Sequence, residues 1–390
     1  MAVFADPDAE APFVREATEA VNIGPADLAK SYLSSDRLLD AAAQTGATAV
    51  HPGYGFLSEN TAFSKAVTAA GLTWIGPRSE AVESMGSKIQ ARQLADAAGV
   101  PIIPGFDESQ ARSDLAAAAE RIGFPVLVKA AAGGGGKGIR IVHEAAGFDE
   151  ALDEAINEAE RSFGDGDMIV ERYIQRPRHV EVQIVGDKHD NVIDLGTREC
   201  SVQRRYQKLL EEAPAPNLPH ATRSGLRESA RLLAAAIGYD SAGTVEFIVD
   251  DETGDYFFLE MNTRLQVEHP VTESVAGVDL VELMIRSAAG EPLTIAQDDV
   301  RLTGHAIEAR INAEDPTKGF APQIGTISIL DVPAAVRWDS AIEQGSQISP
   351  HYDAMVAKLI VEGPDRPTAL GSMRTALDRL VIGGVVTNSG

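Results

Sequence analysis

Two glutamates placed symmetrically about a predicted turn are the first residues whose spacing suggests chemistry. Glu246 lies in one β-rich stretch and Glu260 in the next, and a hairpin centred on Thr253 would place them opposite each other. Asn262 shares the face of Glu260, because side chains alternate along a strand. Facing carboxylates repel, and Mg²⁺ or Mn²⁺, which prefer oxygen ligands, would relieve the repulsion. If the hairpin is considered alone, the alternative is that Glu246 and Glu260 are exposed strand residues that bind no ion.

The residues that follow this hairpin alternate between polar and apolar side chains. Arg264, Gln266 and Glu268 are separated by Leu265 and Val267. A planar guanidinium suits a small planar anion such as bicarbonate, and a nearby carboxylate could accept the proton of that anion. A solvated loop would explain the charges but not their order. The spacing therefore indicates a site at which an anion is bound and deprotonated.

A run of four glycines, residues 133–136, lies between two apolar β-rich stretches at 124–130 and 139–143. Backbone N–H groups of glycines can surround a polyphosphate without obstruction by side chains. Lys129 and Lys137 add positive charge. A flexible linker is the alternative, but a linker does not usually join two apolar strands. Phosphate binding is therefore favoured, although a glycine-rich loop alone is a weak signal.

Strand-like and helix-like stretches that would position these residues extend along the whole chain. In residues 1–85 they alternate, which predicts a parallel sheet. The helices that we expect are residues 35–44, 60–70, 88–98, 111–121, 148–161, 224–237, 280–289 and 368–380. The strands that we expect are residues 48–51, 72–75, 124–130, 139–143, 168–174, 180–185, 192–195, 208–212, 244–249, 256–261, 305–311, 326–329 and 354–361.

The composition of the 390 residues excludes several classes of protein. The chain carries 58 acidic and 34 basic side chains, a net charge of −24, so nucleic acid is not an expected partner. No apolar run reaches the roughly 18–20 residues of a membrane helix, and the single cysteine, Cys200, cannot form an internal disulfide. The length predicts two to three domains. We therefore expect a cytoplasmic protein that binds neither nucleic acid nor membrane.

Together these motifs resemble the biotin carboxylases, ATP-grasp enzymes that form the first half of biotin-dependent acetyl-CoA, propionyl-CoA and pyruvate carboxylases. The matching stretches span nearly the whole chain and are residues 51–60, 133–138, 178–183, 199–208, 211–216, 260–270 and 304–316. The resemblance implies an α/β and α+β fold in three parts. These are an N-terminal parallel-sheet (pre-ATP-grasp, Rossmann-like) domain at 1–85, an ATP-grasp domain at 86–290 and a C-terminal mixed β domain at 291–390.

The resemblance also implies which residues hold each group. The nucleotide site would comprise Lys88, Lys129, Gly135, Gly136, Ile139, Glu171, Arg172, Tyr173, Ile174, His179, Gln203 and Tyr206. Two Mg²⁺ or Mn²⁺ ions would be held by Glu246, Glu260 and Asn262. Bicarbonate would be bound by Lys208, Arg264, Gln266 and Val267. Glu268 would deprotonate the bicarbonate, and Arg264 and Arg337 would stabilise the enolate of biotin, the carboxyl acceptor.

The implied reaction is ATP-dependent carboxylation of biotin through carboxyphosphate. The biotin would be attached to a carrier protein or carrier domain, and a carboxyltransferase would use the carboxylated product. A homodimer or a larger complex is expected. The acyl-CoA or keto acid that is finally carboxylated is not implied, because that choice belongs to the carboxyltransferase.

Three departures from the family pattern are expected to matter. Tyr206 stands where the family more often has His or Asn near the nucleotide, and a phenol would alter those contacts rather than abolish them. The chain also begins after the first strand and helix of the family and stops before its last helical stretch. We therefore expect a fragment whose first sheet has an unpaired edge.

Two other functions fit part of the pattern. Another ATP-grasp ligase, such as a carbamoyl-phosphate synthase half or a purine-pathway carboxylase, would share the hairpin and the glycine run. Residues 260–270 and the stretch around Arg337 argue against it. A nucleotide-binding remnant without catalysis would explain the expected truncations, but every expected catalytic side chain is present.

Overall fold

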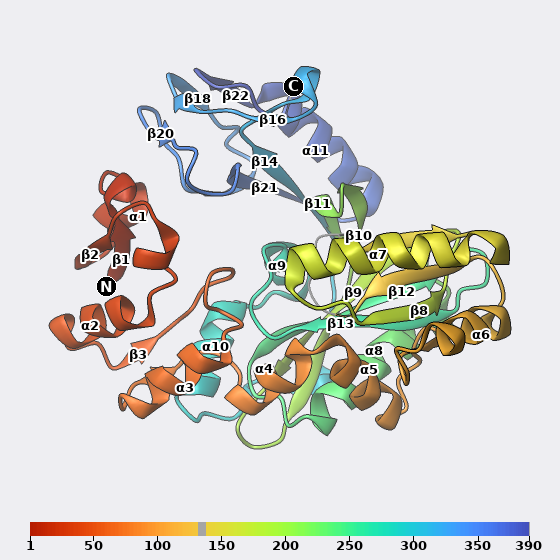
Figure 1. Cartoon of the computed structure of the whole chain (residues 1–390). Helices are drawn as coiled ribbons and strands as arrows, with labels where there is room; N and C mark the ends of the chain where they lie inside the picture. Colours follow the sequence, from red (N-terminus) through yellow and green to blue (C-terminus); the bar gives the residue numbers. More distant parts are fainter. Residues whose placement is uncertain (132–137, 390) are drawn as a thin grey trace.

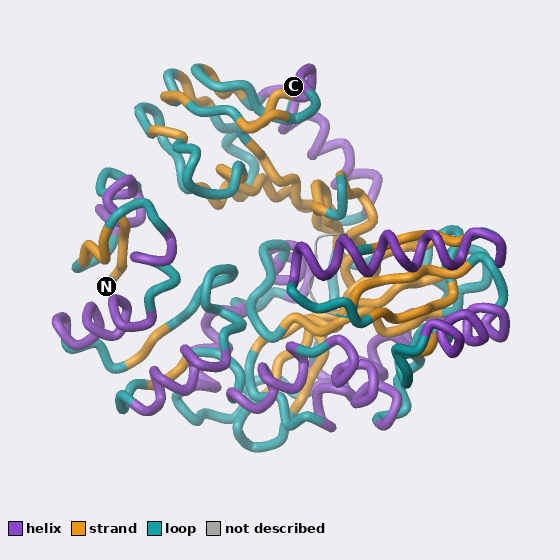
Figure 2. The backbone as a smooth tube through the Cα atoms, in the orientation of Figure 1, coloured by secondary structure: helices purple, strands orange, loops and turns teal. Residues whose placement is uncertain are grey.

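One central sheet joins most of the chain in the computed structural model, which describes residues 1–131 and 138–389 (Figure 1). Its eight antiparallel strands are, in order across the sheet, β13 (Tyr256–Asn262), β12 (Ala242–Asp250), β9 (Pro177–Gly186), β10 (Val192–Arg204), β11 (Gln207–Ala213), β14 (His305–Asn312), β21 (Met355–Gly363) and β19 (Arg337–Ser340). Figure 2 shows these strands continuing from the middle of the molecule to its upper part. Strands from both sides of residue 290 therefore belong to one sheet.

The two faces of β9 and β12 carry different kinds of side chain. Val180 and Val182 of β9 and Phe247 of β12 pack with helices α5 (Lys88–Ala97) and α8 (His220–Ala236) in one apolar core. Because side chains alternate along a strand, Glu181 and Glu246 point to the opposite face. That face is covered by the loop before α9 (His269–Ala276), while α10 (Leu280–Ala288) packs nearby on β12 and β9.

A separate four-stranded sheet lies to the right in Figure 1. Its strands are β5 (Gly105–Phe106), β8 (Met168–Arg172), β6 (Val126–Ala130) and β7 (Ile139–Val142). Helices α6 (Arg112–Ile122) and α7 (Phe148–Phe163) bury one face of it, with Leu115 and Leu152 in the core. The expected strand–loop–strand arrangement is confirmed, since β6 and β7 pair directly. The connecting residues 132–137 lie outside the described part of the chain.

The N-terminal segment contains two parallel strand pairs, as the alternation predicted. These are β1 (Ala2–Ala5) with β2 (Ala20–Gly24) and β3 (Ala49–Val50) with β4 (Thr73–Trp74). The helices of this segment are α1 (Pro12–Glu16), α2 (Ser35–Thr45), α3 (Thr61–Ala69) and α4 (Ser79–Gly86). Among the described residues the two pairs are not joined into one sheet. A cavity of about 190 Å³ is lined by residues of β1 and β3, including Val3 and Val50.

The C-terminal segment packs helix α11 (Arg366–Arg379) on β14 and β21, with Ile307, Leu359 and Met373 in the core. Three short antiparallel pairs complete it: β15 (Glu314–Asp315) with β16 (Ala321–Pro322), β17 (Gly325–Thr326) with β20 (Gln347–Ile348), and β18 (Ile329–Asp331) with β22 (Val381–Gly383). Among the residues that the structure describes, no helix is long and apolar enough to span a bilayer.

Some elements differ from the sequence-based expectation. The strand expected at 192–195 extends to Arg204, because charged residues in its second half, such as Arg198, are buried in pairs with other side chains. Helices α1, α4 and α9 were not predicted. Helix α9 begins at His269 directly after the polar run, with Pro270 in its first turn, where a missing backbone N–H costs nothing.

Gly186 and Gly371 should respond in opposite ways to substitution by alanine. A Cβ at Gly186, the last residue of β9, would lie 1.9 Å from the carbonyl oxygen of Tyr239, so Gly186→Ala should destabilise the protein by about 1–3 kcal/mol. A Cβ at Gly371 inside α11 meets nothing within 4 Å, so Gly371→Ala should stabilise by up to about 1 kcal/mol. Thermal unfolding measures both. Equal shifts of Tm in the two variants would contradict the packing described for β9.

Candidate active site

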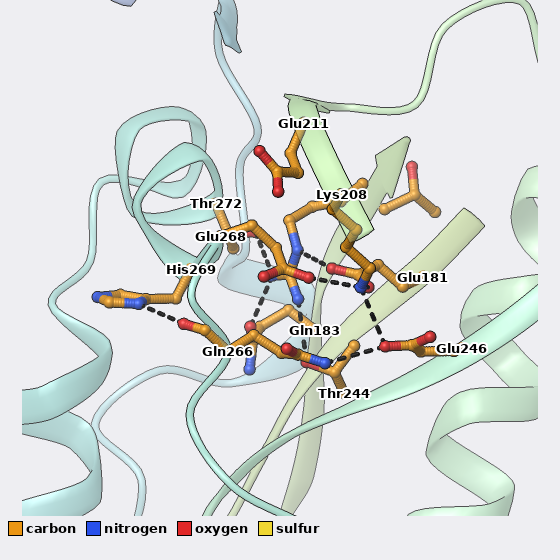
Figure 3. Close-up of polar contacts among 12 residues, drawn as sticks. Glu181, Gln183, Lys208, Glu211, Thr244, Glu246, Gln266, Glu268, His269 and Thr272 are labelled. Carbon is orange, nitrogen blue, oxygen red and sulfur yellow. Dashed lines mark hydrogen bonds and ion pairs between the residues drawn. The ribbon is translucent and has the colours of Figure 1, made fainter. Parts of the chain in front are cut away.

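Lys208 on β11 is the centre of a buried group of charges (Figure 3). Its Nζ atom lies 2.7 Å from Glu181, 3.0 Å from Glu246 and 2.6 Å from Glu268. These three carboxylates are buried. They raise the pKa of Lys208 well above its usual value, although burial opposes the charged form. Lys208 is therefore a permanent cation placed among three anions.

Strand register aligns four charged residues in a row beneath Lys208. Arg198 of β10 is the partner of Glu181 in β9, Glu181 is the partner of Glu246 in β12, and Glu246 is the partner of Glu260 in β13. Arg198 is completely buried and donates to Glu181, to Gln183 (2.7 Å) and to the hydroxyl groups of Thr272 (2.8 Å) and Thr244 (2.9 Å). Burial opposes ionisation of Glu181, but Arg198 and Lys208 together lower its pKa to about 2.

Glu268, at the end of the polar run, has no exposed surface. Its two oxygens are held separately: Oε1 accepts from Lys208 at 2.6 Å, and Oε2 accepts from Nη2 of Arg310 on β14 at 2.9 Å. A carboxylate fixed by two cations cannot rotate freely, so its lone pairs have a defined direction. Such a group suits proton abstraction from a substrate bound beside it.

The hairpin register predicted from the sequence is confirmed at the end of the hairpin away from the turn. There Glu246 faces Glu260 and Thr244 faces Asn262. Glu260 as a whole residue is exposed, but its carboxyl group is surrounded by protein atoms. This desolvation, together with the charge of Glu246, raises the pKa of Glu260. The carboxylate of Glu260 accepts no hydrogen bond from a described residue. Asn262 is within 2.8 Å of Glu246. Two carboxylates and an amide oxygen form a donor set that fits a hard divalent cation.

Arg264 and Gln266 form the polar wall beside this hairpin. Arg264 donates to Glu59 (2.8 Å), to Asn262 (2.8 Å) and to Gln266 (3.0 Å). Gln266 in turn donates to Glu246 at 3.0 Å, as Figure 3 shows. The guanidinium expected to bind an anion is thus half-buried and fixed in orientation, and the residues expected from the polar run do lie together.

His179 and Gln203 connect this charge cluster to the predicted nucleotide site. Nε2 of His179 lies 2.6 Å from Glu246, and Nδ1 lies 2.9 Å from Nε2 of Gln203. Burial opposes protonation of His179, but Glu246 raises its pKa overall. Burial likewise opposes ionisation of Glu246, but Lys208 and His179 lower the pKa of that carboxyl.

Lys88, the first residue of α5, lies near Lys129 on β6 of the four-stranded sheet. Burial and the Lys129 charge lower the pKa of Lys88, while Lys129 is paired with Glu171 at 2.6 Å. Ile139 is the strand partner of Lys129, so it lies on the same part of the sheet. Two neighbouring lysine cations are suited to bind phosphate groups.

The segment predicted to read an adenine edge ends β8. The backbone N–H groups of Arg172 and Tyr173 donate to Pro104 (2.8 Å) and Pro125 (3.1 Å), and are therefore used inside the protein. Ile174 is buried. The remaining predicted phosphate contacts, Gly135 and Gly136, lie outside the described residues.

Arg337 on β19 is held apart from the Lys208 cluster. It donates to Glu273 at 2.7 Å and to both oxygens of Asp339 at 3.0 Å. The Asp339 carboxylate also lies 3.6 Å from Lys358, whose amine donates to the Val267 carbonyl at 2.8 Å. Arg337 is therefore linked to the polar run through the paired strands β19 and β21, and its own hydrogen bonds go to Glu273 and Asp339 rather than to Arg264.

Sequence reasoning assigned no role to Glu181, Arg198 or Arg310. Glu181 contacts Lys208, Arg310 contacts Glu268, and Arg198 contacts Glu181. A signal for Glu181 was present: Val180, Glu181, Val182 and Gln183 alternate in polarity along a strand that lies in the middle of the chain. Polar residues that alternate with valine in a strand buried on both faces must find partners inside the protein.

Fold and site together define the chain as an ATP-grasp ligase. Residues 1–82 match the description "Biotin carboxylase, N-terminal domain", residues 87–296 match "Carbamoyl-phosphate synthase L chain, ATP binding domain", and residues 308–390 match "Biotin carboxylase C-terminal domain". The chain belongs to the biotin carboxylase family, whose members are ATP- and bicarbonate-dependent ligases.

Solved structures and curated proteins agree with this assignment. A biotin carboxylase from Campylobacter jejuni superposes with a TM-score of 0.94 at 45% identity, covering 99% of this chain and 87% of that one. The biotin carboxylase domain dimer of Hydrogenobacter thermophilus 2-oxoglutarate carboxylase, in complex with MgADP, ADP and bicarbonate, gives 0.92 at 46% identity, with coverages of 99% and 86%.

The curated relatives are longer than this chain. The alpha subunit of methylcrotonoyl-CoA carboxylase from Arabidopsis thaliana, named as mitochondrial, is 49% identical over all of this chain and 53% of its own length. The propionyl-CoA carboxylase alpha chain of Ruegeria pomeroyi is 48% identical over all of this chain and 60% of its own length. The chain thus spans little more than half the length of these relatives. A cytoplasmic location stays a prediction.

Tyr206 should be replaceable by asparagine with a gain in stability. Arg204 pairs with Gln207, so Arg205 (φ +50°) and Tyr206 (φ +67°) form a two-residue turn in the left-handed region. Asparagine and histidine tolerate this region better than tyrosine, which gives a physical reason for the residues usual in the family. Because Tyr206 is 68% exposed, Tyr206→Asn should raise the free energy of unfolding by about 0.5–1 kcal/mol. Chemical denaturation measures it.

Tyr206→Phe is the matched control, since it keeps the backbone cost and removes only the hydroxyl. It should leave stability unchanged. If the phenol contacts the nucleotide, both variants should raise KM for ATP. Equal stability of the asparagine and phenylalanine variants would contradict the strain argument.

His269 should make the protein less stable in mild acid. It is buried with Nδ1 2.7 Å from the Gln266 carbonyl, and burial together with the Lys358 charge lowers its pKa to about 3. An unfolded histidine titrates near 6.5. Between these values the unfolded chain binds more protons, so the free energy of unfolding falls as pH falls, by up to about 1.4 kcal/mol per pH unit, and this contribution is fully present above about pH 6.5.

The slope of the free energy of unfolding against pH tests the role of His269. Denaturation of His269→Asn between about pH 4 and 7 should show a shallower dependence on pH than the unsubstituted protein. His220→Asn, at the exposed start of α8, is the control and should keep the original slope. An unchanged slope in His269→Asn would contradict the assignment of a neutral buried imidazole.

Proposed function

We propose that this chain carboxylates biotin, with Glu268 as the base that deprotonates bicarbonate. The observation that carries the proposal is the fixed position of the Glu268 carboxylate between Lys208 and Arg310, next to the polar wall of Arg264 and Gln266. Bicarbonate bound to the Arg264 guanidinium would present its hydroxyl to a carboxylate that is already held in a fixed orientation.

Charge neutralisation supports the phosphoryl transfer step. The deprotonated bicarbonate oxygen attacks the γ-phosphorus of ATP, the bond to the ADP oxygen breaks, and carboxyphosphate forms. Lys88 and Lys129 would bind the phosphates, and His179 and Gln203 would complete the nucleotide site. Mg²⁺ or Mn²⁺ held by Glu246, Glu260 and Asn262 would supply Lewis acidity. A reaction of this kind depends on positioning and on balancing charge.

The second step uses the arginines. Carboxyphosphate breaks into CO₂ and phosphate, the phosphate takes the N1 proton of biotin, and N1 then bonds to the carbon of CO₂. The enolate oxygen of biotin would be stabilised by Arg264 and Arg337. Arg337 is 40% exposed and lies on β19 at the edge of the sheet, where a biotin attached to a carrier could reach it.

The assembly that we propose follows the relatives. Segments 1–85, 86–290 and 291–390 would act as N-terminal, ATP-grasp and C-terminal parts of a biotin carboxylase unit. A biotin carboxyl carrier and a carboxyltransferase would complete an acyl-CoA carboxylase, with methylcrotonoyl-CoA or propionyl-CoA as the final acceptor suggested by the relatives' names. A homodimer is proposed because a related domain is described as a dimer.

Glu268→Gln should abolish carboxylation without unfolding the protein. The amide keeps a similar shape but cannot accept the bicarbonate proton, so turnover should fall by about 10²-fold or more. The measurement is ADP release, and incorporation of labelled bicarbonate into free biotin, with ATP and Mg²⁺. Glu282→Gln, which breaks only an exposed pair with Arg286 on α10, is the control and should keep full activity.

Two outcomes would favour other functions. Turnover supported by ammonia or an aminoimidazole, with biotin inert, would favour a different ATP-grasp ligase. Nucleotide binding that is unaffected by Glu268→Gln, with no turnover in either protein, would favour a nucleotide-binding role without catalysis.

A further inference from the structure

Two buried glutamates behind the catalytic cluster have no role in the reaction described above. Glu211 of β11 and Glu308 of β14 are direct strand partners, so their side chains point to the same face of the sheet. Their exposed fractions are 1% and 0%. Figure 3 includes Glu211 beside the Lys208 cluster. Two ionised carboxylates cannot face each other at such a position without a counter-charge or a proton.

The hydrogen bonds of this pair are incomplete in a specific way. Oε1 of Glu211 accepts from Nε of Arg310 at 2.6 Å, but its Oε2 atom has no partner among the described residues. Both oxygens of Glu308 are buried and also without a described partner. An unpaired buried carboxylate is very costly. One proton placed between the two residues would form a hydrogen bond between Oε2 of Glu211 and one oxygen of Glu308, so that each residue has at least one partner.

The surrounding charges do not provide an alternative. The groups that face the pair are Arg310 on the same strand as Glu308, Lys208 on β11, Lys358 on β21, Glu268 before α9 and Tyr54 after β3. Lys208 already contacts three other carboxylates, and Lys358 donates to the Val267 carbonyl. Burial, with the neighbouring carboxylates, raises the pKa of Glu308 well above its usual value and that of Glu211 to about 7.

Arg310 connects this pair to the proposed base. Its Nε donates to Glu211 and its Nη2 donates to Glu268 at 2.9 Å. A second full negative charge at the pair would draw the guanidinium away from Glu268. We propose that Glu211 and Glu308 are positioning residues that share one proton, and that this shared proton keeps Arg310 bonded to Glu268. The inference rests on the proposed function of Glu268.

Infrared spectroscopy tests the shared proton without any turnover. A protonated carboxyl group has a carbonyl stretch distinct from that of a carboxylate. At neutral pH the difference spectrum between the unsubstituted protein and Glu308→Gln should contain this band. Glu212→Gln, the neighbouring glutamate that binds His305 and Arg366 instead, is the control and should retain the band. A difference spectrum without the band would overturn the proposal. Failure of the proposed function would leave the band unchanged, so the two failures are distinguishable.

Kinetics with two volume-matched variants test the positioning role. Glu308→Gln keeps a neutral hydrogen-bond donor and should retain kcat/KM for bicarbonate within about threefold at neutral pH. Glu308→Leu leaves Glu211 with an unpaired oxygen and should lose at least about tenfold. If leucine is as active as glutamine, the position serves only to fill space and the proposal is wrong.

The pH profile separates positioning from general stability. As pH rises through the ionisation of the pair, the unsubstituted protein should lose kcat/KM, whereas Glu308→Gln has no such ionisation. The kcat/KM of Glu308→Gln divided by that of the unsubstituted protein should therefore rise toward alkaline pH. The ratio cancels the ionisation of bicarbonate itself. A ratio that stays constant with pH would overturn the proposal even if the infrared band is present.

Discussion

The ammonium group of Lys208 is the interaction on which the buried polar layer depends. It contacts carboxylates from β9, β12 and the loop before α9, and its side chain is only 12% exposed. A buried ion pair gains little net stability, but removal of one partner is strongly destabilising, because it leaves charges without compensation. The cluster is therefore better understood as a device that fixes the positions of its members than as a source of stability.

Strand register is the second constraint, because the cluster exists only in one alignment of the strands. Arg198, Glu181, Glu246 and Glu260 lie in one row across β10, β9, β12 and β13. A slip of one residue in any strand would move its charged side chain to the face packed by α5 and α8. The apolar core on that face and the ion pairs on the other thus select the same register, and each supports the other.

The sequence predicted the hairpin best, since symmetry about Thr253 and strand alternation were enough to place Glu246 opposite Glu260. It predicted β10 poorly, because Arg198 and Glu199 look like exposed residues until their partners on other strands are known. The local sequence pattern shows the alternation of a strand. It does not show which distant carboxylates will pair with a buried arginine and stabilise it. The role of Arg310 was missed for the same reason, since its two partners lie 99 and 42 positions away.

The continuity of the central sheet has a consequence for how the protein unfolds. Strands β11 and β14 are neighbours in the sheet although residues 214–304 separate them in sequence. Four pairs of facing residues join the two strands. Cutting the chain near residue 290 would therefore expose the edges of both strands, and open edges invite pairing with other molecules. The sequence modules and the cooperative folding units of this protein do not coincide. The ATP-binding and C-terminal parts should melt as one unit, and isolated halves should aggregate.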